Sequence, residues 1–327
     1  MRAVQVVTLD GPAAVRVGEV PDPDPGDGGV LIEVHAAGVT FPDVLLTRGL
    51  YQYRPDPPFV PGSEVAGVVR YAPPGSGLSV GDRVAAFPGT GGFAELVATT
   101  PSQVFALPAE VPFAEGAGIP MNYLTVHFGL LRRGRLQAGE TVLVHGAAGG
   151  VGTAAVQLAK ALGARVVAVV SSDEKGRVAR EAGADDVVPA AGFLGAVKEL
   201  TGGRGVDLVV DPVGGDRSLP DRFTDSLRSL ATEGRLLVVG FTGGEIPTVR
   251  VNRLLLNNIA VVGVGWGAFF AKRPEFLAEQ WAELLPFLQD GALRPALAPV
   301  RPLERAAEAL ADMDERRATG KVVLAVR

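Results

Sequence analysis

The segment VHGAAGGVGTAA at residues 144–155 is the part of the sequence whose residue types and spacing most clearly predict chemistry. Within it, Ala147, Gly149 and Gly152 occupy the three positions of a G-x-G-x-x-G turn, with alanine at the first. Small residues there let the backbone turn tightly, approach a pyrophosphate and pack a helix against a strand. Free N–H groups at the helix N-terminus attract the anion. The segment therefore predicts a dinucleotide-binding loop.

A glycine-rich turn can also serve only the close packing of a helix on a strand, with no ligand. The position of the loop favours a nucleotide, because it follows the apolar run ETVLV (140–144) and opens a helix. Apolar residues in that helix recur from Val151 to Leu162 at helical spacing, and Gly163 is placed to end it. This strand–turn–helix is the context in which the motif binds a dinucleotide.

The end of the next predicted strand indicates which dinucleotide is bound. NAD enzymes place an acid about 20 residues beyond the glycines to hold the ribose 2′-OH. Val170 stands at that position here, and hydroxyl and cationic side chains follow it, namely Ser171, Ser172, Lys175 and Arg177. A charge-assisted hydrogen bond to a 2′-phosphate contributes ~1.5–3 kcal/mol, which is about a ten- to hundredfold preference. We predict NADPH as the cofactor, in preference to NADH.

A second interpretation of this segment involves no ligand. Asp173 would cap the following helix, while Lys175 and Arg177 would be solvated surface charges. The two interpretations differ in whether NADPH binds more tightly than NADH.

Composition excludes several other classes of function. The chain has 327 residues, a net charge of -5 and no cysteine. Clustered cations for nucleic acid are absent, as are disulfides and thiolate nucleophiles. Three scattered histidines, His35, His127 and His145, lack metal-ligand spacing, so we predict no metal site. Without a long apolar run or a signal-like start, we expect a cytoplasmic protein with no membrane or nucleic-acid partner.

Hydrophobic periodicity divides the chain into two regions with different sequence patterns. The first 110 or so residues carry short alternating segments bounded by Gly, Pro and Asp, which predict strands. From about residue 119, apolar strands alternate with helical stretches, which is typical of a doubly wound parallel sheet. The predicted strands are 141–145, 165–170, 185–188, 206–211, 235–240 and 259–264. The fold class is therefore α/β, and the final strand KVVLAVR is expected to return to the β-rich part.

Motifs along nearly the whole chain carry a family resemblance. They are GVTFPD (38–43), PGSEVAG (61–67), GDRV (81–84), GGFAE (91–95), VLVHGAAGGVG (142–152), DPVGG (211–215), VVGF (238–241), VVGV (261–264) and GKVVL (320–324). In order and spacing the chain resembles the zinc-independent medium-chain dehydrogenase/reductase superfamily, specifically the NADPH:quinone oxidoreductase group.

The resemblance implies a GroES-like β-rich catalytic domain (1–120 and 265–327) and a Rossmann NADPH-binding domain (121–264), with NADPH in the cleft and a homodimer. Carried over position by position, the family's cofactor contacts fall on Ala148, Gly149, Gly150 and Val151 for the pyrophosphate, and on Ser171 and Lys175 for the ribose phosphate. Those for the nicotinamide half fall on Thr125, Val213, Gly240, Phe241, Val264 and Gly265. The apolar members of this set would be core residues in any such sheet.

Three positions depart from the family patterns. Zinc-dependent relatives have histidine in P-G-H-E where this chain has Ser63, and quinone reductases usually have asparagine at Thr40 and often tyrosine at Leu45. Without zinc ligands, alcohol oxidation through a polarising metal is not expected. The other two changes leave fewer amide and phenol donors for a substrate.

Hydride transfer to a quinone or an activated enone needs little protein apparatus, because the nicotinamide supplies the chemistry. The protein must position the rings, exclude water and offer donors to the oxygen where charge develops. Candidate donors are Thr40, Tyr51 and Tyr53, which could equally be a turn residue and packed tyrosines. Asp43 is expected to cap a helix and not to act as an acid.

We therefore predict an NADPH-dependent reductase of quinones or α,β-unsaturated carbonyls. Reduction of an enoyl thioester and a non-catalytic NADPH-binding role are the alternatives. The sequence leaves the physiological acceptor, the proton donor and the choice between one- and two-electron reduction open.

Overall fold

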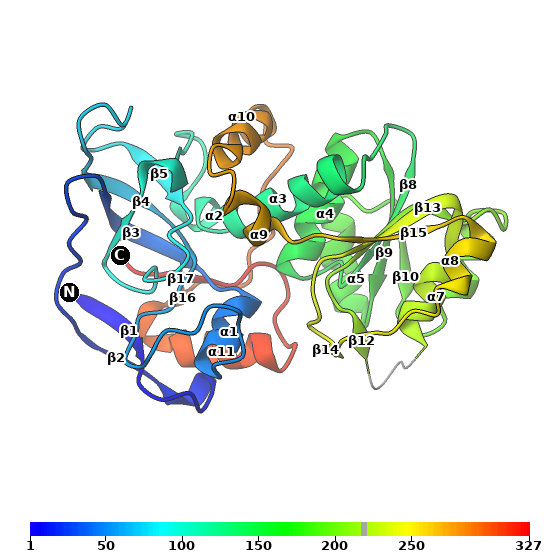
Figure 1. Cartoon of the computed structure of the whole chain (residues 1–327), viewed down its shortest axis with the longest axis horizontal. Coiled ribbons are helices and arrows are strands. Elements are labelled where there is room, and N and C mark those ends of the chain that lie inside the picture. The colour runs from blue at the N-terminus through cyan, green and yellow to red at the C-terminus, as the bar shows by residue number, and fades with distance from the viewer. Residues whose placement is uncertain (217–220) are drawn as a thin grey trace. The chain divides into compact units, whose positions relative to one another are not determined.

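The computed structural model describes residues 1–216 and 221–327 of the chain (Figure 1). These residues form two compact units. Unit 1 comprises Met1–Asn122, Arg273–Gly291 and Leu297–Arg327, and unit 2 comprises Tyr123–Lys272 and Ala292–Ala296. In the described part of the chain, no helix is long and apolar enough to span a bilayer.

Unit 1 is built on strands, as its alternating segments predict. Its described residues form a seven-stranded sheet in the order β16-β17-β3-β4-β5-β7, with β6 also paired to β3, and a separate hairpin β1-β2. The strands are β1 (Arg2–Val6), β2 (Val15–Glu19), β3 (Val30–Gly38), β4 (Glu64–Tyr71), β5 (Arg83–Ala86), β6 (Leu96–Thr99), β7 (Val104–Ala106), β16 (Arg301–Pro302) and β17 (Val323–Ala325). Strand β17 pairs antiparallel with β3, so the predicted return of the chain's end to the β-rich part is confirmed.

The core of unit 1 joins both ends of the chain. Val4, Ile32, Val65 and Phe93 are fully buried together with Leu310 near the C-terminus. The helices of this unit are α1 (Phe41–Thr47), α2 (Phe113–Gly116), α10 (Phe276–Gln289) and α11 (Ala306–Asp314), with the short 3₁₀ turns η1 (Pro12–Ala14), η2 (Pro101–Gln103) and η4 (Leu303–Arg305). Helix α3 (Pro120–His127) continues from unit 1 into unit 2.

Unit 2 contains the predicted parallel sheet. Its order among the described residues is β10-β9-β8-β11-β13-β15, six strands that all pair in parallel. They are β8 (Thr141–His145), β9 (Arg165–Val170), β10 (Asp186–Pro189), β11 (Val206–Asp211), β13 (Leu230–Val238) and β15 (Ala260–Gly263). The doubly wound prediction is confirmed. Strand β13 begins earlier than predicted. Its first half includes an irregular segment, in which Glu233 takes a left-handed φ of 65° and the register with β11 shifts.

Helices cover the sheet of unit 2. On one face, Leu143, Val167 and Val209 pack with Phe193 of α6 and Phe223 of α7. Helices α4 and α5 pack against β8, β9 and β10. The elements between and beside the strands are η3 (Phe128–Arg133, a π-helix), α4 (Gly150–Ala161), α5 (Asp173–Glu181), α6 (Phe193–Leu200), α7 (Arg222–Arg228), α8 (Asn252–Asn257), α9 (Trp266–Phe270) and the short pair β12 (Gly215–Asp216) and β14 (Gly244–Glu245). Figure 1 shows α7 and α8 beside the sheet, in yellow-green and yellow.

Candidate functional site

Most of the cofactor-binding residues predicted in unit 2 follow the carboxyl ends of its parallel strands. Because parallel strands end at one edge of the sheet, their loops gather there. The loop 146–149 follows β8, Ser171 follows β9, Val213 follows β11, Gly240 follows β13 and Val264 follows β15. Thr125 is not in one of these loops but in α3, where it is half-buried.

The strand order arranges these loops in a row. Along the sheet, the loop of β9 comes first, then those of β8, β11, β13 and β15. The chain runs outward from β8 through β9 to β10, and in the other direction from β11 to β15. The point where the direction reverses, between β8 and β11, is where doubly wound sheets bind ligands. The glycine-rich loop lies at that point.

The turn of the glycine-rich loop is made by Gly146, one residue before the predicted first motif position. Gly146 has a left-handed φ of 57°, while Ala147 is fully buried. A Cβ on Gly152 would overlap the Gly146 carbonyl oxygen, so glycine there permits the helix to approach the turn. Gly149 is the N-cap of α4, and Gly163, with φ 81°, follows its C-terminus as predicted.

Backbone amides at the start of α4 are available to an anion. Among the described residues, the N–H groups of Ala148, Gly150 and Val151 have no recorded acceptor, and the first helical bond is that of Thr153 to Gly149. The Gly149 N–H is different, since it donates to the Gly146 carbonyl oxygen at 2.9 Å. The helix has 12 residues, so its dipole also favours negative charge at this end.

The segment after β9 brings a hydroxyl and a cation together. The Lys175 Nζ donates to the Ser171 Oγ at 3.3 Å, and Ser171 is exposed. Ser172, not Asp173, is the N-cap of α5, because its Oγ accepts from the Lys175 N–H at 3.3 Å. The strand-end position is occupied by Val170, which is buried, and not by an acid.

The loops after β11 and β13 are bound to one another. The Gly243 N–H donates to the Val213 carbonyl oxygen at 2.7 Å, and the Thr242 N–H donates to that of Pro212 at 3.2 Å. Val213 is half-buried, whereas Phe241 is 38% exposed. This exposure leaves the Phe241 ring able to contact a ligand.

The predicted contact residues that follow β13 and β15 differ in solvent exposure. Val264 is buried, Gly240 is half-buried and Gly265 is exposed. The Val264 N–H donates to the Val238 carbonyl oxygen at 3.0 Å, which holds the loop after β15 against the end of β13.

A buried polar network supports these loops and was not predicted from the sequence. The Asp211 Oδ1 accepts from the N–H groups of Val213 at 2.9 Å and Gly214 at 3.0 Å, which shapes the turn after β11. Arg222 pairs with the Asp211 carboxylate at 3.4 Å and donates to the Gly214 carbonyl oxygen. The DPVGG motif marks Asp211, but no local pattern marks Arg222, because the two meet only through the fold.

His145 ends β8 beside this network. Its Nε2 lies 2.8 Å from the Ser226 Oγ, and Ser226 in turn donates to the Arg222 carbonyl oxygen at 2.9 Å. Since the serine proton is used there, the histidine Nε2–H is the donor. Burial lowers the pKa of His145 to about 4, despite the opposing influence of Asp211. His145 is therefore neutral and structural at neutral pH.

In unit 1, Thr40 and Asp43 form a buried capping box at the start of α1. The Asp43 Oδ2 accepts from the Thr40 N–H at 2.7 Å and from the Thr40 Oγ1 at 2.6 Å. Its Oδ1 accepts from the Gly62 N–H at 3.1 Å. The expected capping role of Asp43 is confirmed. Burial raises the pKa of Asp43 to about 6, although the bonds from Thr40 oppose that rise.

A second set of buried polar side chains, Ser63, Glu64 and Lys321, lies beside the capping box of Thr40 and Asp43. The Ser63 Oγ is 3.3 Å from the Thr40 Oγ1. The next residue, Glu64, forms a buried ion pair with Lys321 and accepts from the Met121 N–H at 2.7 Å. Lys321 also donates to the Val39 carbonyl oxygen at 2.9 Å. The sequence analysis did not predict a role for Lys321, although the GKVVL motif contains it.

The two candidate tyrosines differ in environment. Tyr53 is 58% exposed. Tyr51 is half-buried, and burial followed by the nearby Asp43 carboxylate raises the pKa of its phenol. Tyr51 is therefore a neutral hydroxyl near Asp43 at neutral pH.

The residues present do not suit a zinc ion. In the described part of the chain, no three His, Cys, Asp or Glu side chains gather closely enough to hold a metal. Thr40 and Ser63 offer neutral hydroxyls, and Glu64 is already paired with Lys321. This set of groups lacks the thiolate and imidazole ligands that zinc prefers.

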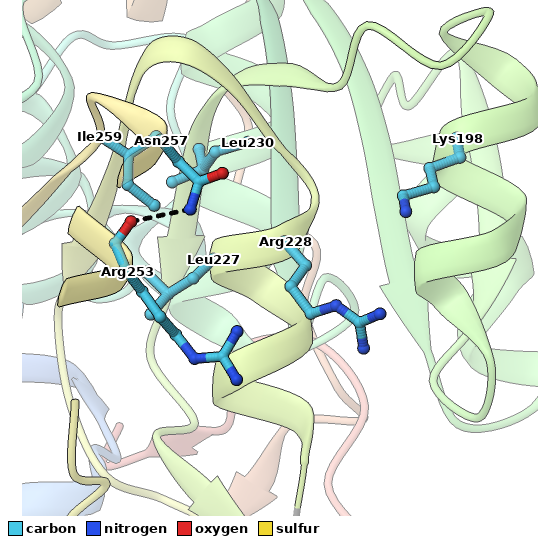
Figure 2. A pocket seen from close by; sticks show the side chains of 7 residues that line it. All are labelled: Lys198, Leu227, Arg228, Leu230, Arg253, Asn257 and Ile259. Atoms are coloured by element: carbon cyan, nitrogen blue, oxygen red, sulfur yellow. Dashed lines mark hydrogen bonds between the residues drawn. The ribbon is translucent and has the colours of Figure 1, made fainter. Parts of the chain in front are cut away.

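A separate pocket of about 300 Å³ lies in unit 2 (Figure 2). Leu230 begins β13 and Ile259 precedes β15, so the pocket is near the amino ends of the strands, away from the predicted site. Its lining is completed by Lys198, Leu227, Arg228, Arg253 and Asn257. It shares no residue with the predicted site.

Two family models match the chain. Residues 26–109 match the alcohol dehydrogenase GroES-like domain, and residues 150–290 match the zinc-binding dehydrogenase family. The GroES-like and Rossmann architecture predicted from the sequence is confirmed by these matches and by the solved structures below.

Individual relatives align over nearly their whole length. The chain is 38% identical to quinone oxidoreductase-like protein 2 of Bos taurus, over 91% of this chain and 85% of that protein. A probable oxidoreductase from Mycobacterium abscessus is 45% identical with a TM-score of 0.91, covering 100% of this chain and 99% of that one. The quinone oxidoreductase of Thermus thermophilus, also solved in complex with NADPH, is 36% identical with a TM-score of 0.85 and full coverage of both chains.

Proposed function

Because the chain belongs to the quinone oxidoreductase group of the medium-chain dehydrogenase/reductase superfamily, we propose that it reduces quinones or α,β-unsaturated carbonyls with NADPH. The observation that carries the cofactor assignment is the pair formed by Ser171 and Lys175 after β9, where Val170 occupies the position at which NAD enzymes place an acid. A relative solved with NADPH supports the same assignment.

The residues of unit 2 fit such a cofactor. Amides of Ala148, Gly150 and Val151 would receive the pyrophosphate, and Ser171 with Lys175 would receive the 2′-phosphate. When bound, NADPH supplies the hydride and its electron pair. Ser172 would contribute mainly by capping α5 and so fixing the phosphate-binding segment.

The remaining predicted residues would position the nicotinamide half. We assign this role to Thr125, Val213, Gly240, Phe241, Val264 and Gly265. Residues 121–264 would then be the NADPH-binding domain, with residues 1–120 and 265–327 as the catalytic domain. Thr40 and Tyr51 would position the acceptor from the catalytic side.

The proposed reaction uses no zinc. A quinone or enone accepts hydride without metal polarisation, because its π-system is already electron-poor. Hydroxyls at Thr40 and Ser63, where a zinc site would need thiolate or imidazole, support this part of the proposal.

We further propose that the protein is a cytoplasmic homodimer. Among the described residues, strand β15 is at the edge of its sheet and pairs with a neighbouring strand, β13, on one side alone. Helix α8 next to it exposes Leu255 at 77% and Leu256 at 74%. Exposed leucines beside an open strand favour burial against a second copy. Sedimentation equilibrium of the wild type and Leu255→Asp would test this.

The function is tested by following NADPH absorbance with 1,4-benzoquinone, a simple enone and crotonyl-CoA under one set of conditions. We expect oxidation with the quinone or the enone. Turnover with the thioester alone would replace the proposal by enoyl-thioester reduction, and NADPH binding without any turnover would indicate a non-catalytic protein.

A further inference from the structure

The hydroxyl of Thr40 is not available as a donor when Asp43 is ionised. A threonine hydroxyl has one proton to donate. In the structure this proton is directed to the Asp43 Oδ2, 2.6 Å away, at a carboxyl group that is fully buried. Thr40 can then only accept from a further partner, such as the Ser63 hydroxyl at 3.3 Å. An oxyanion formed on a substrate would then face the lone pairs of the Thr40 Oγ1, which repel it.

Protonation of Asp43 reverses this arrangement. A carboxylic acid has an O–H to donate, so the Asp43 Oδ2–H would donate to the Thr40 Oγ1. The Thr40 proton would then be free to turn toward another acceptor. The hydrogen bond between Asp43 and Thr40 can thus run in either direction. Thr40 has a proton to donate to another group only when Asp43 is protonated.

We propose that Asp43 supplies the proton of the reduction through the Thr40 hydroxyl, and that only the acid form of Asp43 aims that hydroxyl at the acceptor oxygen. This inference rests on the proposed function. Asp43 contacts Thr40 and not the acceptor, so it is a positioning residue, and Thr40 is the group that would touch the substrate.

Other charged groups around Asp43 set when it holds its proton. Burial, the dominant cause, raises the pKa of Asp43 to about 6, and the neighbouring Glu64 adds to that rise. The hydrogen bonds from Thr40 and the charge of Lys321 act in the opposite direction. Tyr51 also faces Asp43 but remains a neutral phenol. The acid form is therefore populated near neutral pH, unlike that of an ordinary aspartate.

The step balances in atoms and charge. Quinone reduction needs a hydride, which the reduced nicotinamide supplies as its C–H bond breaks and it is oxidised, and one proton. The Thr40 Oγ1–H bond breaks as its proton bonds to the negative oxygen of the reduced acceptor. The Asp43 Oδ2–H bond breaks as its proton passes to the Thr40 Oγ1. Asp43 is left as a carboxylate, held by the Thr40 and Gly62 N–H groups, and is protonated again through the Thr40 hydroxyl before the next cycle, since its own carboxyl group is fully buried.

The pH dependence of kcat/KM in the full-length protein tests this proton transfer from Asp43 through Thr40. For the wild type, we expect kcat/KM to fall about tenfold per pH unit above a midpoint near 6, because the acid form is required. Thr40→Val should lower kcat/KM by about 10²-fold or more and abolish that limb, while Thr40→Ser should restore both. Thr47→Val is the matched control, since Thr47 is also buried, at the other end of α1, but donates to the Val44 carbonyl oxygen.

A measurement without acceptor keeps the inference separate from the proposed function. Infrared difference spectra of the wild type against Asp43→Asn should show a protonated carboxyl lost with a midpoint near pH 6. A carboxyl that is ionised at pH 5, or equal pH profiles for Thr40→Val and Thr47→Val, would overturn the inference. A wild type that reduces no acceptor would contradict the proposed function, whatever the carboxyl spectra show.

Discussion

The two polar regions of this molecule are built from different groups. In unit 2, the glycine-rich loop presents backbone amides at the start of α4, and its side chains are mostly small. In unit 1, the polar cluster consists of buried side chains, with Asp43, Glu64 and Lys321 all at most 2% exposed. The glycine-rich loop presents polar groups that carry no charge, whereas the cluster in unit 1 has charges that must balance inside the protein.

This difference has consequences for stability and pH. Backbone amides do not titrate, so we expect anion binding by the loop of unit 2 to depend little on pH and to be limited by the space around its backbone. Buried ionisable side chains depend on their partners, and removing one partner leaves an uncompensated charge. The substitutions below separate these two behaviours.

Lys321→Met should have the largest effect. It leaves Glu64 buried without its cation, and breaking a buried pair in this way costs about 3–5 kcal/mol of unfolding free energy. Chemical denaturation measures this. The double variant Glu64→Gln with Lys321→Met should recover part of the loss, because no isolated charge remains. Equal losses in the single and double variants would show that the charge pair is not what matters.

His145→Gln should flatten the pH dependence of stability. The folded protein holds His145 neutral, with its pKa lowered to about 4, while the unfolded chain takes a proton near its ordinary value. Stability from this residue is therefore present above about pH 6.5 and lost as pH falls toward 4, by about 3 kcal/mol. Urea denaturation at pH 7 and pH 4.5 checks this. Parallel pH curves for the two proteins would contradict it.

Lys175→Ala should weaken NADPH binding while leaving NADH binding unchanged. The lost charge-assisted hydrogen bond contributes ~1.5–3 kcal/mol, or about ten- to hundredfold in affinity. Arg180→Ala is the control, because Arg180 is exposed in the last turn of the same helix. Equal weakening of both cofactors would mean that Lys175 does not recognise the 2′-phosphate.

Gly152→Ala should displace the glycine-rich turn. The added methyl group would overlap the Gly146 carbonyl oxygen, and overpacking of this kind costs about 1–3 kcal/mol. Gly149→Ala is the matched control, since its Cβ would lie 3.4 Å from the same oxygen. Thermal unfolding should distinguish the two variants. If they behave alike, close packing at residue 152 is not required.

The fold could be predicted from the sequence because its signals are local. The glycine-rich turn, the apolar strands and Gly163 each carry their own pattern, and all correspond to observed elements. The start of strand β13 was harder to predict from the sequence, since its first half contains the exposed Thr232 and Glu233 and carries no alternating apolar pattern.

The polar side-chain networks could not be predicted in the same way. Arg222 meets Asp211, and Lys321 meets Glu64, only after distant segments come together. The sequence also suggested Thr40 as a free donor, whereas the structure commits its proton to Asp43. Which hydrogen bond a hydroxyl makes depends on neighbours at ångström distances, and spacing along the chain does not specify them.

The central claim is that the wild-type protein seats a phosphorylated nicotinamide dinucleotide on the glycine-rich loop and the pair of Ser171 with Lys175. Equilibrium dissociation constants of NADPH and NADH, measured by fluorescence titration, test it most directly. We predict that NADPH binds about ten- to hundredfold more tightly. Tighter binding of NADH, or no binding of either at saturating concentration, would contradict the account.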